Sequence, residues 1–280
     1  MRMENHKTCK LRRQTRLNRS ACLKRSKRLK ERIRRLKSVI CRLFAEICYV
    51  LFPRGCAGCE KPDSVLCGEC AKLLEKNVAK SFSQSCFLWE AAFSCGFYRG
   101  RVRKMILEWK DKSDEEVTKY LKKPLKDLVR KNGFADKIKS QGEKNIQITV
   151  VPVPSSPSSL HRRGRFHTLK LCDYVAQGVK ENCPPGVTVK VKKLLYVDNV
   201  KKSVENNSAR SRSNRLKGHI HVKNGQKGNH SARVEASEKL SGVILVDDIL
   251  TTGATVRSCS RALKSAGYTP LTAVTIACGI

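Results

Sequence analysis

The segment Val243–Thr255 reads VILVDDILTTGAT, and the fold can be inferred from it. Its apolar beginning is typical of a strand buried in a parallel sheet, and we expect that strand at Gly242–Val246. The strand should end at Asp247 and Asp248, and the residues after the turn predict a helix at Ala254–Ala266. Ligands of open α/β sheets bind beyond the carboxyl ends of the strands, so this turn is the first candidate site.

The chemistry of the turn suits a sugar phosphate. A glycine lets backbone N–H groups approach a phosphate, and the first amides and the dipole of the following helix favour an anion. The predicted phosphate-binding residues are Thr251, Thr252, Gly253, Ala254 and Thr255. Asp247 and Asp248 would repel a phosphate, but they suit sugar hydroxyls or water-bridged Mg²⁺, and they are the candidate catalytic residues.

Two other interpretations of the same segment exist. A strand, turn and helix with a threonine N-cap need no ligand, although two acids beside several small polar residues exceed what capping requires. A Walker B strand of a nucleoside triphosphatase, which would here be Leu245–Asp248, would also end in acidic residues. The chain contains no G-x-x-x-x-G-K-[ST] motif, which disfavours that interpretation.

A second candidate loop, Pro154–Gly164, follows a predicted buried strand at Ile146–Val153. Small residues and prolines leave backbone amides free to meet an anion, and the two arginines can bind a pyrophosphate through bidentate hydrogen bonds. The predicted pyrophosphate-binding residues are Pro154, Ser155, Arg162 and Arg163. The alternative is a solvated basic loop without a ligand.

Strands and helices are predicted to alternate along the chain. The other predicted strands are Ala91–Tyr98, Val187–Val191 and Leu271–Ala277. The other predicted helices are Val102–Trp109, Val117–Lys131 with a kink at Pro124, and Thr168–Val179. This alternation implies an α/β fold, in which helices flank a parallel, doubly wound sheet.

Four cysteines form the pattern Cys56-x2-Cys59-x7-Cys67-x2-Cys70. Two C-x-x-C turns can complete a tetrahedral all-sulfur site, which predicts a structural Zn²⁺. The basic beginning of the chain is not followed by an apolar signal segment, so we expect a reducing compartment in which thiols bind metal. Unliganded or redox cysteines are the alternative.

The charge of the chain is strongly unbalanced, with 58 Lys and Arg against 24 Asp and Glu and a formal net charge of +34. Such an excess favours polyanions, either nucleic acid or an anionic membrane surface, whereas the bland alternative is a tail that promotes solubility. Residues 1–38 form a basic tail that we expect to be disordered or conditionally helical. Ser38–Phe52 predicts an amphipathic helix too short to span a bilayer, and Asn199–Lys239 predicts a polar, basic excursion.

The complete pattern resembles known families. The turn at Val243–Thr255 is similar to the signature of type I phosphoribosyltransferases. With a strand ending in Val-Pro-Val-Pro, an Arg-Arg-Gly turn and the cysteine module, the chain from Leu51 to Gly279 resembles the ComF family of competence-associated, phosphoribosyltransferase-like proteins. Gly96–Lys112 is similar to the segment that carries the family's lysine, here Lys110.

Arg212, with Leu216-Lys217-Gly218, is similar to the family's Arg-x-x-Asn-hydrophobic-x-Gly stretch, although Arg215 stands in place of the Asn. The family usually has Arg-Gly-Phe-Asn-Gln where this chain has Arg163-Gly164-Arg165-Phe166-His167. The resemblance implies that Lys110 and Arg212 contact a substrate.

The resemblance also implies the organisation and the function. Together with the basic tail at 1–38 and the amphipathic helix and zinc module predicted at 39–80, it gives a phosphoribosyltransferase-like domain at 90–280. The ligand would be phosphoribosyl pyrophosphate with Mg²⁺, or a nucleotide phosphate. The role would be to handle single-stranded DNA during natural transformation, in the cytoplasm or at the inner face of the membrane, with a competence helicase or translocase as partner. A catalytically inactive nucleic-acid-binding protein on this fold and a nucleobase salvage phosphoribosyltransferase remain alternatives.

Overall fold

The computed structural model describes residues 54–111, 115–141, 146–198, 220–223 and 241–279, with residues 31, 36–37 and 39–41. The chain divides into two compact units, Met1–Arg54 and Gly55–Ile280, and the candidate site lies within the second unit. The predicted basic tail and the predicted helix at Ser38–Phe52 lie almost entirely outside the described residues. The predicted division into a cysteine module and an α/β domain stays a prediction.

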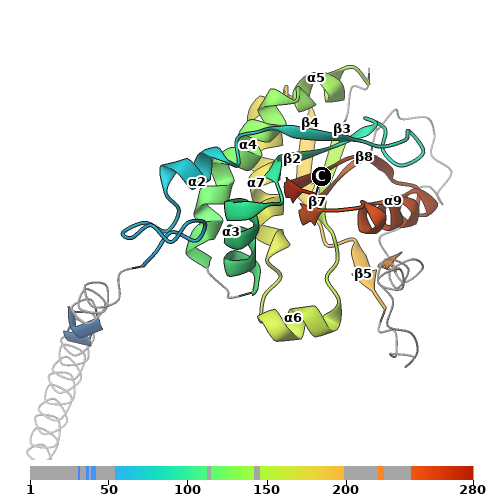
Figure 1. The fold of residues 1–280 in the computed structure, drawn as a ribbon. Helices are drawn as coiled ribbons and strands as arrows, with labels where there is room; N and C mark the ends of the chain where they lie inside the picture. Colours follow the sequence, from blue (N-terminus) through green and yellow to red (C-terminus); the bar gives the residue numbers. More distant parts are fainter. Residues whose placement is uncertain are drawn as a thin grey trace, which may run out of the picture. The chain divides into compact units, whose positions relative to one another are not determined.

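A six-stranded sheet forms the centre of the second unit, with strand order β1-β2-β8-β7-β3-β4 (Figure 1). The strands are β1 (Val78–Ser81), β2 (Ala91–Phe97), β3 (Ile146–Pro152), β4 (Val187–Val191), β7 (Ser241–Leu250) and β8 (Thr269–Cys278). β1 pairs antiparallel with β2, and all other neighbours pair parallel. The prediction of an α/β fold with a mostly parallel sheet is therefore confirmed.

Helices cover both faces of this sheet, which explains why its central strands are apolar along their length. One face carries α3 (Gly100–Asp111), α4 (Lys122–Lys131), α5 (Phe134–Lys139) and α7 (Thr168–Asn182), and α9 (Ala254–Ser265) covers the other (Figure 1). In β7, Ile244 and Val246 pack into the larger hydrophobic cluster with α3, α4 and α7. Val243 and Leu245 pack into the second cluster with α9.

The cysteine pairs belong to the same hydrophobic interior as the helices of the first face. α2 (Gly68–Lys72) begins directly after Cys67, and Cys56 and Cys70 are buried in the larger cluster with Val102 and Met105 of α3. Because small modules cannot bury a core of their own, this packing gives the cysteine segment support from the sheet.

The loop predicted at Pro154–Gly164 is partly helical, so that prediction was wrong over most of its length. The helix is α6 (Pro157–Arg163), and Ser156 caps it by accepting a hydrogen bond from the Ser159 N–H at 3.2 Å. Pro157 occupies the first turn, where its missing N–H is not needed, and Gly164 ends the helix with a φ of +66°. These are ordinary helix start and stop signals, and the prolines and serines that suggested a loop are the capping residues.

Smaller differences concern boundaries and short elements. β7 continues to Leu250, so the turn before α9 is shorter than predicted. Between Val117 and Lys131 the break falls at residue 121, where a 3-10 helix (Glu115–Leu121) meets α4, and Pro124 sits within the first turn of α4. β1 and the antiparallel pair β5 (Leu195–Val197) and β6 (Ile220–Val222) were not predicted, because strands this short carry little periodicity.

Most of the predicted excursion at Asn199–Lys239 lies outside the described residues, and β6 is the part of it that the structure describes. Within the described ranges, no helix combines the length and the apolar character needed to cross a bilayer.

Candidate functional site

The turn predicted to bind phosphate lies between the end of β7 and the start of α9. Thr251 and Thr252 are exposed, Ala254 and Thr255 are half-buried, and the Thr252 Oγ1 accepts a hydrogen bond from the Ala254 N–H at 3.3 Å. Gly253 is the N-cap of α9 with a φ of +78°, which favours glycine. All five predicted residues therefore stand at a strand's carboxyl end and at the leading amides of a twelve-residue helix, where an anion is electrostatically favoured.

Two cations that sequence reasoning missed flank this turn. The Lys80 Nζ, on β1, donates to the Thr251 carbonyl at 2.8 Å. The Arg257 guanidinium donates to the Thr252 carbonyl at 2.7 Å and lies 4.8 Å from the centre of the Phe82 ring. Arg257 could have been found, because it follows the turn by one helical turn. Lys80 could not, since it is brought there from more than 170 positions away.

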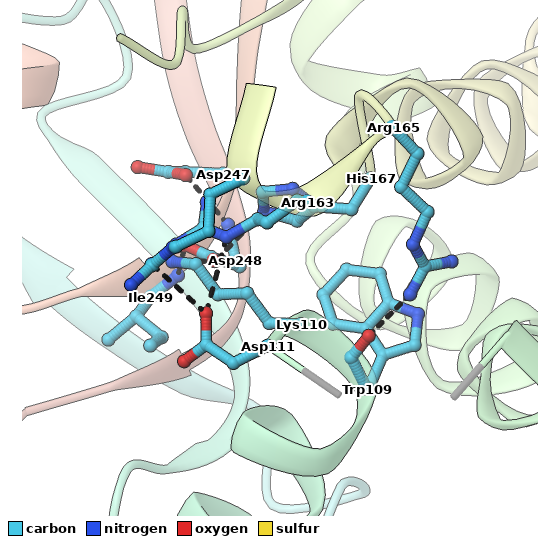
Figure 2. A network of polar contacts seen from close by, with 10 residues as sticks. Trp109, Lys110, Asp111, Arg163, Arg165, His167, Asp247, Asp248 and Ile249 are labelled. Atoms are coloured by element: carbon cyan, nitrogen blue, oxygen red, sulfur yellow. Dashed lines mark hydrogen bonds and ion pairs between the residues drawn. The ribbon is translucent and has the colours of Figure 1, made fainter. Parts of the chain in front are cut away.

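Asp248 lies at the centre of a buried ionic network (Figure 2). It is 4% exposed, and its Oδ2 contacts the Lys110 Nζ and lies 3.1 Å from the His167 Nε2. Its Oδ1 accepts the Ile249 N–H at 2.8 Å. Burial alone would raise the pKa of Asp248, but the His167 hydrogen bond and the Lys110 charge hold that pKa well below its usual value.

The pKa of Asp247 is shifted in the opposite direction. Its Oδ1 accepts the Asp248 N–H at 2.8 Å, and its carboxylate points away from Lys110 and Asp111 (Figure 2). Burial of the carboxyl group, and then the negative charge of Asp248, raise the pKa of Asp247 well above its usual value. The two adjacent acids thus differ in their electrostatics, because the partners of Asp248 favour its ionised form whereas burial and the charge of Asp248 disfavour ionisation of Asp247.

The predicted pyrophosphate arginines reach the same place from α6. The Arg163 Nε lies 3.2 Å from the Asp111 Oδ1, and the Arg162 guanidinium lies 3.5 Å from the same oxygen. The Arg163 side chain is 11% exposed and the Arg162 side chain 69%, so Arg163 is the more firmly placed of the two. Since Asp111 follows Lys110 at the end of α3, Arg163 lies beside the Asp248 network (Figure 2), and Arg162 reaches the same Asp111 oxygen.

The start of the second loop is held next to the acid-bearing strand. The Val153 N–H donates to the Val246 carbonyl at 2.8 Å, which places the half-buried Pro154 and Ser155 beside the end of β7. The structure thus places the beginning of the second loop beside the acid-bearing strand and its arginines beside Asp111. Arg212 lies outside the described residues.

His167 and Arg165 are site residues that the sequence did not identify as functional. The His167 side chain is 2% exposed, packs edge-on against Trp109 at 5.2 Å between ring centres, and keeps a buried Nδ1 without a hydrogen-bond partner among the described residues. Arg165 donates to the Trp109 carbonyl and lies 3.5 Å from Glu115. Both residues stand where this chain departs from the ComF pattern, and that departure was the available signal.

The four predicted metal-binding cysteines converge in space. The sulfur atoms of Cys56, Cys59, Cys67 and Cys70 all lie within 4.8 Å of one another. The Cys59 and Cys67 sulfurs are 3.6 Å apart, close to the roughly 3.8 Å that a tetrahedral Zn²⁺ with Zn–S bonds of about 2.3 Å requires. The donor set therefore fits a structural zinc ion.

Backbone geometry supports this thiol cluster. The Cys56 Sγ accepts N–H groups from Cys67 at 3.3 Å and from Gly58 at 3.4 Å. Burial opposes ionisation of Cys56, but these backbone donors prevail and lower its pKa to about 6. A β-carbon on Gly58 would lie 2.8 Å from the Cys70 Sγ, so a side chain at this position would crowd the cluster.

Known proteins offer a distant structural similarity and no sequence match. No protein-family model and no curated protein matches the sequence. Among solved structures, the chain is similar to a hypoxanthine phosphoribosyltransferase from Staphylococcus aureus, with 12% sequence identity and a TM-score of 0.27. The match covers 55% of this chain and 62% of that protein, so it spans less than two thirds of that protein's length.

Proposed function

We propose that this protein binds phosphoribosyl pyrophosphate or a related nucleotide phosphate at the carboxyl end of β7. The single phosphate would occupy the turn Thr251–Thr255, where helix amides and the cations Lys80 and Arg257 surround it. The observation that carries the proposal is the placement of this turn directly beside a buried acid pair and a separate cluster of cations.

The cations of the site are paired with carboxylates in a way that a pyrophosphate could replace. Lys110 contacts Asp248, and Arg162 and Arg163 share one oxygen of Asp111. A pyrophosphate carries more charge than a carboxylate and accepts several hydrogen bonds at once, so it competes well for these donors. We infer that Lys110 and the two arginines exchange their carboxylate partners for the pyrophosphate when the ligand binds.

Asp247 and Asp248 would then bind the ribose of the ligand. An ionised Asp248 that has lost Lys110 offers its Oδ2 to a ribose hydroxyl, and the Asp247 carboxyl group stands next to it. His167 would keep Asp248 in place through the 3.1 Å contact. His167 would thus act as a positioning residue.

Mg²⁺ fits the site in part. The Asp247 carboxyl group is of the kind that Mg²⁺ takes, directly or through water, whereas both oxygens of Asp248 already accept hydrogen bonds. We propose that Mg²⁺ enters beside Asp247 with the ligand, where it would neutralise pyrophosphate charge. For a transfer reaction, the chain would hold the ribosyl carbon in place and stabilise the departing pyrophosphate through Lys110, Arg162 and Arg163.

The binding proposal is tested by calorimetric titration of the full chain with phosphoribosyl pyrophosphate, ribose 5-phosphate and pyrophosphate, each with and without Mg²⁺. Because the site has separate places for the two phosphate groups, we expect phosphoribosyl pyrophosphate to bind at least about tenfold more tightly than either fragment. Equal affinity for all three would show general anion attraction by a chain of net charge +34, and it would overturn the proposal.

A second candidate function is binding of single-stranded DNA, and the net charge of +34 favours it. The ComF resemblance extends this candidate to DNA handling in natural transformation, and a competence helicase as partner stays a prediction. Binding through lysines and arginines should weaken steeply with salt, by about two to three orders of magnitude between 50 and 200 mM. An affinity that is flat over this range would contradict it.

A further inference from the structure

A pocket of about 320 Å³ lies away from the acid pair, where the segment after α2 meets the end of β2 and the start of α3. The residues that line it are Leu73, Lys76, Phe97, Arg99, Gly100, Arg101 and Val102. None of them belongs to the site described above. The volume is at the lower end of the range for pockets that hold a small organic molecule.

The lining has two parts of different chemistry. Leu73, Phe97 and Val102 supply an apolar wall. Lys76, Arg99 and Arg101 are exposed cations, and no acidic residue lines the pocket. A ligand that complements both parts has an apolar body and a negative charge.

The cations differ in how freely they can meet a ligand. The Arg101 guanidinium lies 3.2 Å from Glu69, but both side chains are exposed, so the pair is weak and can exchange partners. The Arg99 guanidinium lies 5.3 Å from the centre of the Phe97 ring. Guanidinium groups stack on planar rings, so a flat ligand can lie against this pair.

The backbone adds to the preference for an anion. Gly100 begins the twelve-residue α3 with a φ of +48°, and among the described residues a β-carbon there would meet nothing within 4 Å. The first amides of α3 therefore start at an open position of the pocket wall, and the positive end of the helix dipole favours a negative group there.

We propose that this pocket binds a small aromatic acid, meaning a planar ring that carries one carboxylate or phosphate group. The ring would contact Phe97, Val102 and Leu73, and the acid group would lie between Arg99, Arg101 and the first amides of α3. This site is independent of the proposed phosphoribosyl pyrophosphate site. Arg101 and Lys110 are nine residues apart on one helix, which corresponds to about 14 Å along its axis.

The experiment titrates the full chain with benzoate, phenyl phosphate and inorganic phosphate, monitored by calorimetry. Phenyl phosphate and benzoate distinguish the two acid groups, and inorganic phosphate tests whether the apolar wall matters. We expect at least one aromatic acid to bind with a Kd below about 1 mM and inorganic phosphate to bind at least about tenfold more weakly. Failure of both aromatic acids at millimolar concentration, or equal binding of inorganic phosphate, overturns the proposal.

Matched charge reversals separate a specific site from the general positive field. Arg99→Glu should weaken binding by about tenfold or more, whereas Arg103→Glu, an exposed change on α3 outside the pocket, should alter it less than about twofold. Lys76→Glu provides a second test away from α3. Equal losses of affinity in Arg99→Glu and Arg103→Glu would show that the ligand responds only to the general positive charge of the protein. Affinity for phosphoribosyl pyrophosphate, measured in the same variants, should not change, so either proposal can fail without the other.

Discussion

Two partners, His167 and Lys110, keep the pKa of Asp248 low, so substitution of Asp248 should affect both ligand binding and stability. Asp248→Asn keeps the shape of the side chain but removes the charge that holds Lys110 and His167. We expect an affinity loss for phosphoribosyl pyrophosphate of about tenfold or more and a loss of unfolding free energy of about 2 kcal/mol. Calorimetry and urea unfolding measure the two effects. Asp173→Asn, a change at a half-buried residue of α7, is the control and should alter neither.

Asp247 predicts a pH dependence of the opposite sign to that of ordinary acids. Above the usual Asp pKa near 3.9 the unfolded chain ionises this carboxyl, while the folded chain keeps it protonated up to its raised pKa. The unfolded state therefore binds fewer protons, and stability falls as the pH rises through that window. Asp248 contributes the ordinary dependence, since its lowered pKa gives stability that is lost only as the pH falls below about 4.

Asp247→Asn removes the ionisable carboxyl group, and with it the loss of stability at rising pH. It keeps an oxygen that can accept the Asp248 N–H. In urea unfolding, its stability should exceed that of the wild type at pH 8, and the difference should shrink as the pH falls towards 4. A difference that is independent of pH would mean that the Asp247 carboxyl is ionised in the folded protein.

At the scale of elements, α3 and α6 meet through Asp111. This carboxylate holds Arg162 and Arg163 in the absence of ligand, so it competes with a pyrophosphate for them. Asp111→Asn should therefore raise the affinity for pyrophosphate by about two- to fivefold.

Asp136→Asn, at an exposed pair with Lys139 on α5, is the matched control for the change in net charge. If both substitutions raise pyrophosphate affinity equally, Asp111 has no special place in the site.

The elements also show what local sequence can and cannot predict. The apolar runs of β3 and β7, and the helices α7 and α9, were predictable because their residue periods agree with their burial. α6 was missed because its capping residues are also loop residues. His167 was visible only as a departure from a family pattern, and its contact with Asp248 depends on packing between elements 81 positions apart.

In the protein as a whole, a metal ion in the cysteine cluster should stabilise the larger hydrophobic core as well as the two C-x-x-C turns. Cys56 and Cys70 pack in the same interior as α3 and α4, so loss of metal should loosen the larger core. We expect a chelator, or Cys59→Ser, to lower the Tm of the protein by about 10 °C or more.

Cys183→Ser changes a half-buried cysteine outside the cluster and should leave the zinc content at about one ion per chain. An unchanged Tm after complete removal of zinc would contradict a structural role for the metal.

Two glycines allow a test of whether the turn between β7 and α9 binds the phosphate of a phosphoribosyl ligand. Gly253 and Gly267 both have positive φ, +78° and +81°, so an alanine costs about 1 kcal/mol of backbone strain at either position. A β-carbon on Gly253 would in addition lie 2.7 Å from the Phe82 ring and 3.2 Å from the Arg257 guanidinium, so groups that border the turn must shift, whereas Gly267 lies beyond the other end of α9. In calorimetry with phosphoribosyl pyrophosphate, Gly253→Ala should lose about tenfold or more in affinity and Gly267→Ala less than about twofold. Equal affinities in the two variants would contradict phosphate binding at this turn.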